Sequence, residues 1–149
     1  MPWIAQNVEL EQVRYVDLGS GGGFPAIPIC MILGELRATL VDRNEKKTVF
    51  LKKAARRLEL TNVSMENRSF DGQLESGPLL ITSRAIEKPQ DVIPRIVANM
   101  APGDVYLCQS PALEAMELPE DCSVESLSDY YSQSGIRRSA LHVVRMPAE

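Results

Sequence analysis

The sequence runs Val16-Asp17-Leu18-Gly19-Ser20-Gly21-Gly22-Gly23-Phe24-Pro25, with three glycines at alternate positions directly after a short apolar run. A second apolar run over 38–41 ends in an acid, Asp42, which lies nineteen residues past Gly23. A strand, a glycine turn, a helix and a second strand that ends in a carboxylate form the crevice in which α/β sheets bind nucleosides. The pattern therefore predicts an α/β fold with a nucleoside site at this loop.

Two residues of the loop bear on which nucleoside would bind. Phe24 stands where a dinucleotide fingerprint has its third glycine, and Asp17 lies two residues before Gly19. A carboxylate there would repel a pyrophosphate docked on the helix N-terminus, whereas it would attract an ammonium or sulfonium group. S-adenosylmethionine carries both cations, and its ribose diol suits a carboxylate acceptor such as Asp42. The alternative is a tight turn between strand and helix in which Asp17 is incidental.

Composition narrows the class of protein. At 149 residues we expect one domain, 1–149, and no apolar run approaches the ~18 residues of a membrane span. The N-terminus has neither a basic start nor an apolar core, so no signal peptide is expected. Three cysteines without a C-x-x-C pair indicate reduced thiols in a cytoplasmic protein and no zinc site. With a net charge of −4, contact with a polynucleotide would need a local basic patch.

Apolar runs alternate with helical patterns along most of the chain. Helices are expected over 25–33, 44–60 and 88–100, and strands over 13–18, 38–42, 63–66, 79–82, 105–108, 123–127 and 140–146. This order predicts a doubly wound, mostly parallel sheet with an antiparallel edge. The ligand should lie at the carboxyl ends of the first, second and fourth strands, where the connections change direction.

The first two helices carry clear apolar patterns. The residues at 27–33 are apolar nearly all round, which predicts a buried helix. Asn44 is a suitable N-cap for the second helix. Its apolar face is expected to hold Phe50, Leu51, Ala54, Ala55 and Leu58. Its basic side holds Lys46, Lys52, Lys53, Arg56 and Arg57, for which a solvated surface is favoured over contact with RNA phosphates.

Four segments resemble one known family: 17–28 (DLGSGGGFPAIP), 42–47 (DRNEKK) with Phe50-Leu51, 60–63 (LTNV) and 82–85 (TSRA). The chain resembles the RsmG family, also called glucose-inhibited division protein B. The resemblance is clear over about 13–109, and the G-F-P-x-I-P and T-S-R-A segments are more specific than the glycine loop. It implies a class I, Rossmann-like, S-adenosylmethionine-dependent methyltransferase that modifies guanine N7 in small-subunit ribosomal RNA.

The same resemblance assigns roles to residues of this chain. Asp42 would take the ribose hydroxyls, Ser69 and Phe70 would lie beside the adenine, and Arg84 would close the site as its catalytic residue. The alternative for Arg84 is a surface ion pair with Glu87. The full set of residues expected to contact the cofactor is Asp17, Gly19, Ser20, Gly21, Gly23, Phe24, Asp42, Arg43, Ser69, Phe70 and Arg84.

The chain also departs from the family pattern. The family has a helical segment ahead of the core, whereas about twelve residues precede the first strand here. Ala26 replaces a glycine, and Gln109-Ser110 stands where the family tends to have lysine and glycine. These departures keep a second hypothesis open, a non-catalytic cofactor-binding or accessory module, beside a methyltransferase with another substrate. A nucleotide-dependent oxidoreductase is disfavoured by Asp17 and Phe24.

Overall fold

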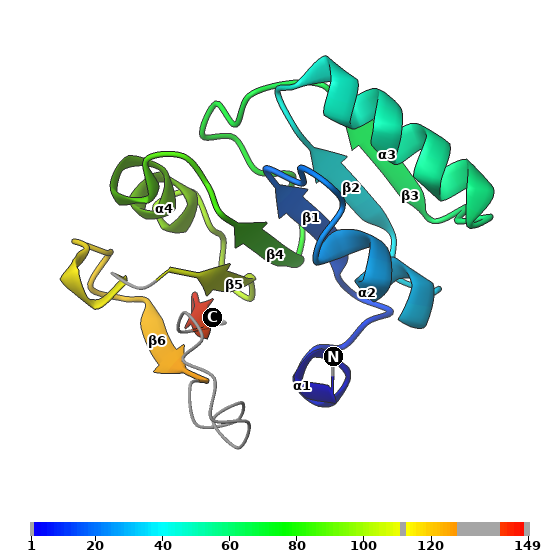
Figure 1. Ribbon diagram of the computed structural model, residues 1–149. Coiled ribbons are helices and arrows are strands. Elements are labelled where there is room, and N and C mark those ends of the chain that lie inside the picture. Colours follow the sequence, from blue (N-terminus) through cyan, green and yellow to red (C-terminus); the bar gives the residue numbers. More distant parts are fainter. Residues whose placement is uncertain (1, 111–112, 128–140, 148–149) are drawn as a thin grey trace, which may run out of the picture.

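The computed structural model describes residues 2–110, 113–127 and 141–147. Strands and helices alternate along most of the chain (Figure 1). Their bounds are α1 (Pro2–Asn7), β1 (Arg14–Leu18), α2 (Ala26–Ile32), β2 (Ala38–Val41), α3 (Glu45–Arg57), β3 (Val63–Glu66), β4 (Leu79–Arg84), α4 (Pro89–Val97), β5 (Val105–Gln109), the 3₁₀ turn η1 (Leu113–Ala115), β6 (Ser123–Ser126) and β7 (Leu141–Arg145).

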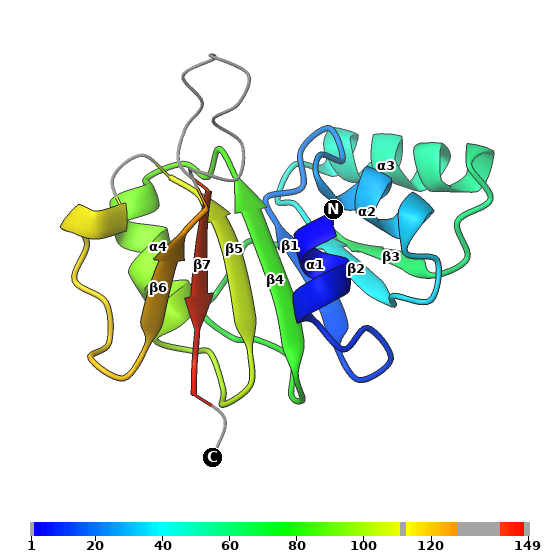
Figure 2. The same ribbon diagram turned by 90° about the horizontal axis from the view of Figure 1, so that it is seen from below.

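All the strands join one sheet in the order β3-β2-β1-β4-β5-β7-β6. The first five pair in parallel, and β7 runs antiparallel to both β5 and β6 (Figure 2). The expected doubly wound sheet with an antiparallel edge is therefore confirmed. The strand order reverses direction between β1 and β4, which is where open sheets of this kind bind ligands.

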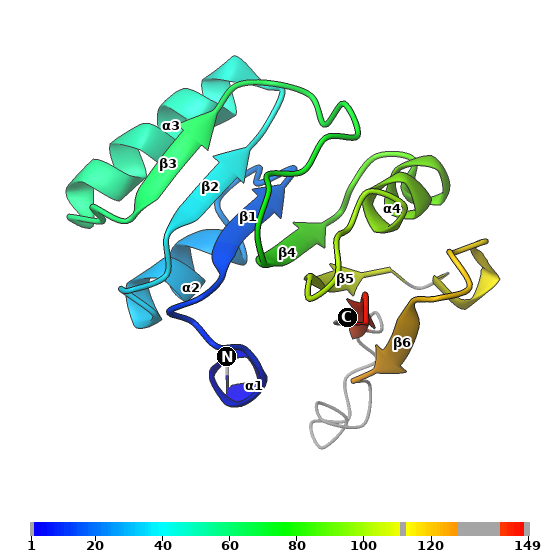
Figure 3. The same cartoon turned by 180° about the vertical axis from the view of Figure 1, so that it is seen from behind.

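Helices cover both faces of the sheet. On one face α1, α2 and α3 contribute Trp3, Ile27 and Leu51 to a core cluster, and on the other α4 contributes Ile93 and Ile96. Figure 1 shows α1 and α2 on the opposite side of the sheet from α4. The connection from β3 to β4 contains no helix and runs as a loop (Figure 3). Both faces of the central parallel strands β1, β4 and β5 are thus largely buried, as their apolar runs require.

The parallel register brings the ends of three strands level. Leu18 of β1 lies beside Val41 of β2 on one side and beside Ser83 of β4 on the other. The residues that follow these positions therefore emerge at one edge of the sheet. The carboxyl ends of the first, second and fourth strands, where the ligand is expected, therefore lie next to one another.

Burial of the helices differs from the sequence prediction. In α2 the side chains of Met31 and Ile32 are 53% and 63% exposed, so the expectation of a helix buried all round is wrong. In α3 Phe50 is 56% exposed, and the buried positions are Thr48, Leu51 and Ala55. A helix lying on a sheet buries one stripe, and apolar residues outside that stripe stay in water.

The N-terminal helix and several element ends were not foreseen. α1 is short and was not predicted, yet Trp3 and Ile4 are buried in the core and the Arg145 guanidinium lies 5.0 Å from the Trp3 ring centre. α3 ends at Arg57 rather than at residue 60, and β4 extends beyond residue 82 to Arg84. Residue 140, where the last strand was expected to begin, lies outside the described residues.

Candidate functional site

The glycine loop leaves β1 in a backbone conformation that brings it across β2. The Gly19 and Ser20 amides both donate to the Val41 carbonyl oxygen, at 2.8 and 3.1 Å. Gly19 has φ +74°, a backbone conformation that L side chains rarely adopt, so the turn directly after β1 favours glycine. The loop therefore lies over the ends of β1 and β2.

Gly23 is the point where the loop meets the two helices. A Cβ atom at this residue would lie 2.7 Å from Ile27 Cγ1 and 2.9 Å from Leu51 Cδ2, closer than real Cβ contacts. Its φ is also positive, at +88°. Only a glycine lets the start of α2 pack this closely against α3. Packing therefore requires a glycine at position 23, in addition to any contact with a ligand.

Asp17 is a buried carboxylate with one free oxygen. Its side chain is 1% exposed, and Thr82 Oγ1 donates to its Oδ1 at 2.5 Å. Its Oδ2 has no hydrogen-bond partner among the residues that the structure describes. Burial raises the pKa of Asp17, while the hydrogen bond from Thr82 and the positive charge of Arg84 act in the opposite direction. An unpaired, desolvated carboxylate oxygen favours a cationic ligand beside it.

A buried hydrogen-bonded chain holds Asp17 in place. The Tyr15 hydroxyl lies 2.8 Å from Thr82 Oγ1, and the single Thr82 proton is donated to Asp17, so Tyr15 must donate to Thr82. Burial and the Asp17 charge raise the pKa of Tyr15 well above its usual value, which keeps the phenol protonated. The sequence reading assigned no role to Tyr15. The available signal was its position two residues before Asp17, on the same face of β1.

Asp42 is fixed by the backbone on both sides of it. The Gly21 amide donates to Asp42 Oδ2 at 2.7 Å, and the Asn44 amide donates to Oδ1 at 2.8 Å. Asn44 in turn caps α3 by accepting from the Lys47 amide, as expected. Asp42 therefore links the glycine loop to the start of α3. Each carboxylate oxygen keeps a further lone pair for a hydroxyl donor.

Arg84 ends β4 at the same edge of the sheet and is exposed. Glu87, the suggested ion-pair partner, binds Arg43 instead, with the Arg43 Nη2–Glu87 Oε2 distance at 2.7 Å. Arg84 forms no ion pair within the described part of the chain, so the alternative of an Arg84–Glu87 pair is wrong. The Arg43–Glu87 pair, whose side chains are mostly exposed, joins the loops after β2 and β4 across the edge.

The remaining expected residues lie around this edge. Phe24 is 59% exposed on the glycine loop. Ser69 is exposed in the loop after β3, whereas Phe70 is half-buried against the core cluster on the α4 face. Arg68 in the same loop is held by Glu66 at 2.6 Å. Arg84 and Asp42 are both close enough to Asp17 for their charges to act on the pKa of Asp17, while Ser69 and Phe70 belong to a neighbouring loop.

A different hollow lies at the opposite edge of the sheet, at the amino ends of β1, β2 and β3. It has a volume of about 580 Å³, and Arg14, Thr39 and Glu75 are among its lining residues. Arg14 is paired with Glu75 at 2.7 Å, and Thr39 donates to the same carboxylate at 3.3 Å. None of the predicted site residues lines it. The side chains of Arg14, Thr39 and Glu75 are thus held by one another.

The part of the chain that the structure describes contains neither a metal-binding cluster nor a membrane-spanning helix. Within 2–110, 113–127 and 141–147 no three His, Cys, Asp or Glu side chains gather in a way that would hold a metal ion. No helix in that same portion is long and apolar enough to cross a bilayer.

Comparison with known proteins gives a family and a fold. The family model described as rRNA small subunit methyltransferase G matches residues 3–141. A curated ribosomal RNA small subunit methyltransferase G from Cellvibrio japonicus is 36% identical over 119 residues, which are 79% of this chain and 54% of that protein. The protein of the same name from Ralstonia nicotianae is 34% identical and covers 83% of this chain and 57% of its own length. The chain thus spans a little over half the length of these relatives.

Solved structures that resemble the chain share its fold at low identity. The putative methyltransferase yhhF from Escherichia coli superposes with a TM-score of 0.71 at 13% identity, covering 99% of this chain and 83% of that one. A SAM-dependent methyltransferase from Thiobacillus denitrificans, solved with S-adenosyl-L-homocysteine, has a TM-score of 0.57 at 16% identity. The match covers 84% of this chain and 48% of that one. At such identities the likeness shows the fold alone, and that fold is the Rossmann-like one that the resemblance to the RsmG family implies.

Proposed function

Because this chain belongs to the rRNA small subunit methyltransferase G family, we propose that it transfers a methyl group from S-adenosylmethionine to a guanine N7 of small-subunit ribosomal RNA. The observation that carries the proposal is the pair of buried carboxylates, Asp17 and Asp42, at the level ends of β1 and β2. We also propose that the protein acts in the cytoplasm, because its proposed substrate is ribosomal RNA.

The residues present fit this cofactor. The unpaired Asp17 Oδ2 supplies a buried anionic acceptor of the kind that an ammonium group needs. Asp42 is oriented by two backbone amides, so its remaining lone pairs are preorganised for the ribose diol. Gly19, Ser20, Gly21, Gly23 and Phe24 would contact the cofactor from the loop, and Arg43, Ser69 and Phe70 from the neighbouring loops.

The chemistry asks for placement rather than for proton transfer. The bound cofactor supplies an electrophilic methyl group on a sulfonium. Guanine N7 has a lone pair and no proton, so this chain needs no general base. Its contribution is to hold the two reactants in line and to exclude water. Arg84, which is exposed and without an ion-pair partner in the described chain, is placed at the edge where its guanidinium would bind the guanine or an RNA phosphate.

Two measurements test the proposal separately. Isothermal titration calorimetry with S-adenosylhomocysteine should show binding, and NAD should show none, since Asp17 would oppose its pyrophosphate. Tritium transfer from labelled S-adenosylmethionine to small ribosomal subunits or to bare 16S RNA tests the reaction, and Arg84→Ala should reduce it. Binding of NAD in place of S-adenosylhomocysteine would contradict the cofactor assignment. Cofactor binding without transfer to any RNA would contradict the enzyme assignment.

A further inference from the structure

The outer side of α3 carries a concentration of positive charge next to the site. Seven of the sixteen lysines and arginines of the chain lie within 43–57, whereas the stretch 43–59 holds two acids, Glu45 and Glu59. The chain as a whole has a net charge of −4, so this surface stands out against the overall sign. α3 begins three residues after Asp42, which brings the charge to the edge of the proposed cofactor site.

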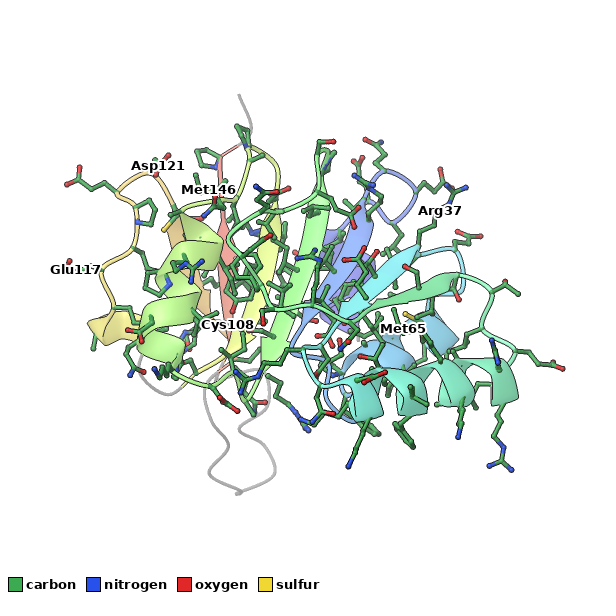
Figure 4. The ribbon with its side chains drawn as sticks, turned by 90° about the horizontal axis from the view of Figure 1, so that it is seen from above. Arg37, Met65, Cys108, Glu117, Asp121 and Met146 are labelled. Atoms are coloured by element: carbon green, nitrogen blue, oxygen red, sulfur yellow. The ribbon has the colours of Figure 1, made fainter. Side chains whose placement is uncertain are left out.

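Four side chains of α3 form a line, which we call the α3 track: Lys46, Phe50, Lys53 and Arg57. Successive members of the line are four, three and four residues apart, which keeps them on one side of a helix. The buried positions Thr48, Leu51 and Ala55 lie on the other side. From Lys46 to Arg57 the track extends about 16 Å along the helix axis. Figure 4 shows nitrogen-tipped side chains of α3 directed away from the sheet.

The cations of α3 are not neutralised by neighbouring acids. Within the described chain, the ion pairs formed by lysine or arginine involve Arg14, Arg43 and Arg68. Of the seven cations in 43–57, only Arg43 is therefore paired. A helix whose charges serve solubility alone commonly alternates them in sign, with acids four residues before bases. The α3 track instead presents cations of one sign, which favours a polyanionic partner.

The aromatic residue of the track adds a second feature. Phe50 is 56% exposed and lies between Lys46 and Lys53, on the side of α3 away from the core. Phe24 on the glycine loop is also exposed, and the loop approaches α3 closely because Gly23 lies against Leu51. Exposed aromatic rings among cations are typical of surfaces that bind single-stranded nucleic acid, in which bases stack on the rings.

We propose that the α3 track binds a single-stranded segment of the RNA substrate, with phosphates on Lys46, Lys53 and Arg57 and a base stacked on Phe50. This inference rests on the proposed function, because the strand bound there would continue toward Asp42 and Arg84 at the adjacent edge. It takes the alternative to a merely solvated helix face, because Phe50 is exposed among these cations and no acid in the described chain pairs with them.

The test compares two triple variants of the full 149-residue chain with equal loss of charge. The first, Lys46→Gln/Lys53→Gln/Arg57→Gln, neutralises the track. The control, Arg37→Gln/Lys52→Gln/Arg56→Gln, neutralises two cations on another side of α3 and one at the far edge of the sheet, where Figure 4 shows Arg37. Binding of a fluorescein-labelled oligouridine of about twelve nucleotides is followed by fluorescence anisotropy over a series of salt concentrations.

Neutralising the track should weaken RNA binding by about tenfold or more. It should also reduce the slope of log affinity against log salt by about 2, since each phosphate contact in a single strand contributes roughly 0.7. The control variant should keep nearly the wild-type slope. Phe50→Ala should weaken binding by about tenfold without changing the slope, whereas Val49→Ala, at an exposed position elsewhere on α3, should have little effect.

Other results would overturn the inference. Equal losses in the two triple variants would show general attraction by net charge rather than binding along the track. Wild-type affinity in the track variant, or no binding of the oligouridine by the wild type, would remove it altogether. Calorimetry with S-adenosylhomocysteine on the same proteins keeps the proposed function separate, because cofactor binding should be unchanged in every variant and its absence would count against the proposed function instead.

Discussion

Asp17 carries its charge in a place that water does not reach. At 1% exposure, with one oxygen unpaired in the described chain, its ionised form is more costly in the folded protein than in the unfolded one. The pKa of Asp17 is accordingly raised, chiefly by burial. A buried carboxylate of this kind does not add to the stability of the folded protein. A cationic ligand that compensates its charge would account for its presence.

The Asp17→Asn variant should therefore separate stability from binding. Because the folded-state pKa of Asp17 lies above its unfolded value of 3.8, ionisation costs stability as pH rises through the folded pKa, and the cost is absent below 3.8. Without a ligand, the variant should be more stable than wild type in urea at pH 7, with the difference shrinking toward pH 4. Its affinity for S-adenosylhomocysteine should fall at least tenfold. A variant that is less stable at pH 7 and binds as before would contradict this account.

Replacing Asp42 should have the opposite effect on stability. Asp42→Ala removes the acceptor of both the Gly21 and Asn44 amides, so the free energy of unfolding should fall by roughly 2–4 kcal/mol. Binding of S-adenosylhomocysteine should weaken by tenfold or more, measured by calorimetry at a temperature where the variant is folded. Asp91→Ala, at an exposed aspartate in the first turn of α4, is the control and should change neither value much. Unchanged affinity in Asp42→Ala would remove the ribose assignment.

At the scale of elements, the glycine loop is set by how closely α2 and α3 approach it. Gly23 and Gly22 are neighbours, but only Gly23 has a positive φ and a Cβ position that would collide with Ile27 and Leu51. A Cβ on Gly22 would meet nothing within 4 Å. The alternate spacing of the motif already sets Gly19, Gly21 and Gly23 apart from Gly22, and the structure adds a packing reason at Gly23 that Gly22 lacks.

Gly23→Ala should destabilise the protein by about 2–4 kcal/mol, because it combines overpacking with a left-handed backbone. Gly22→Ala is the matched control in the same loop and should stay within about 1 kcal/mol of wild type. Urea unfolding followed by circular dichroism measures both. Equal effects of the two substitutions would show that the approach of α3 does not determine the glycine at position 23.

The elements themselves were largely predictable, and their exposure was not. Parallel strands such as 79–84 are buried on both faces and leave continuous apolar runs, and Asn44 marks the start of α3 through a local hydrogen bond. Phe50 is different, because a helical wheel cannot tell which apolar residues lie toward the sheet. The hydrogen-bonded series Tyr15–Thr82–Asp17 could not be predicted from the sequence either, since it depends on pairing between strands 65 residues apart.

At the scale of the whole molecule, the residues of the candidate site come from two halves of one sheet. Asp17 and Asp42 belong to the β3-β2-β1 half, and Arg84 belongs to the half that begins with β4. The Arg43–Glu87 pair is exposed and contributes little as a bridge between them. A ligand that contacts Asp17, Asp42 and the loop after β4 would bind only the folded arrangement, so binding should stabilise the entire sheet rather than one loop.

S-adenosylhomocysteine should accordingly raise the melting temperature of the protein as a single transition. At a free concentration about a hundredfold above the dissociation constant, the added stability is about 2.7 kcal/mol, which for a chain of this length corresponds to a rise of roughly 5 to 10 °C. Differential scanning calorimetry measures it. NAD at the same concentration should leave the transition in place, because Asp17 opposes its pyrophosphate, and Asp42→Ala should largely lose the response to S-adenosylhomocysteine. A rise with NAD equal to that with S-adenosylhomocysteine would show that the crevice does not select for a cationic adenosyl ligand.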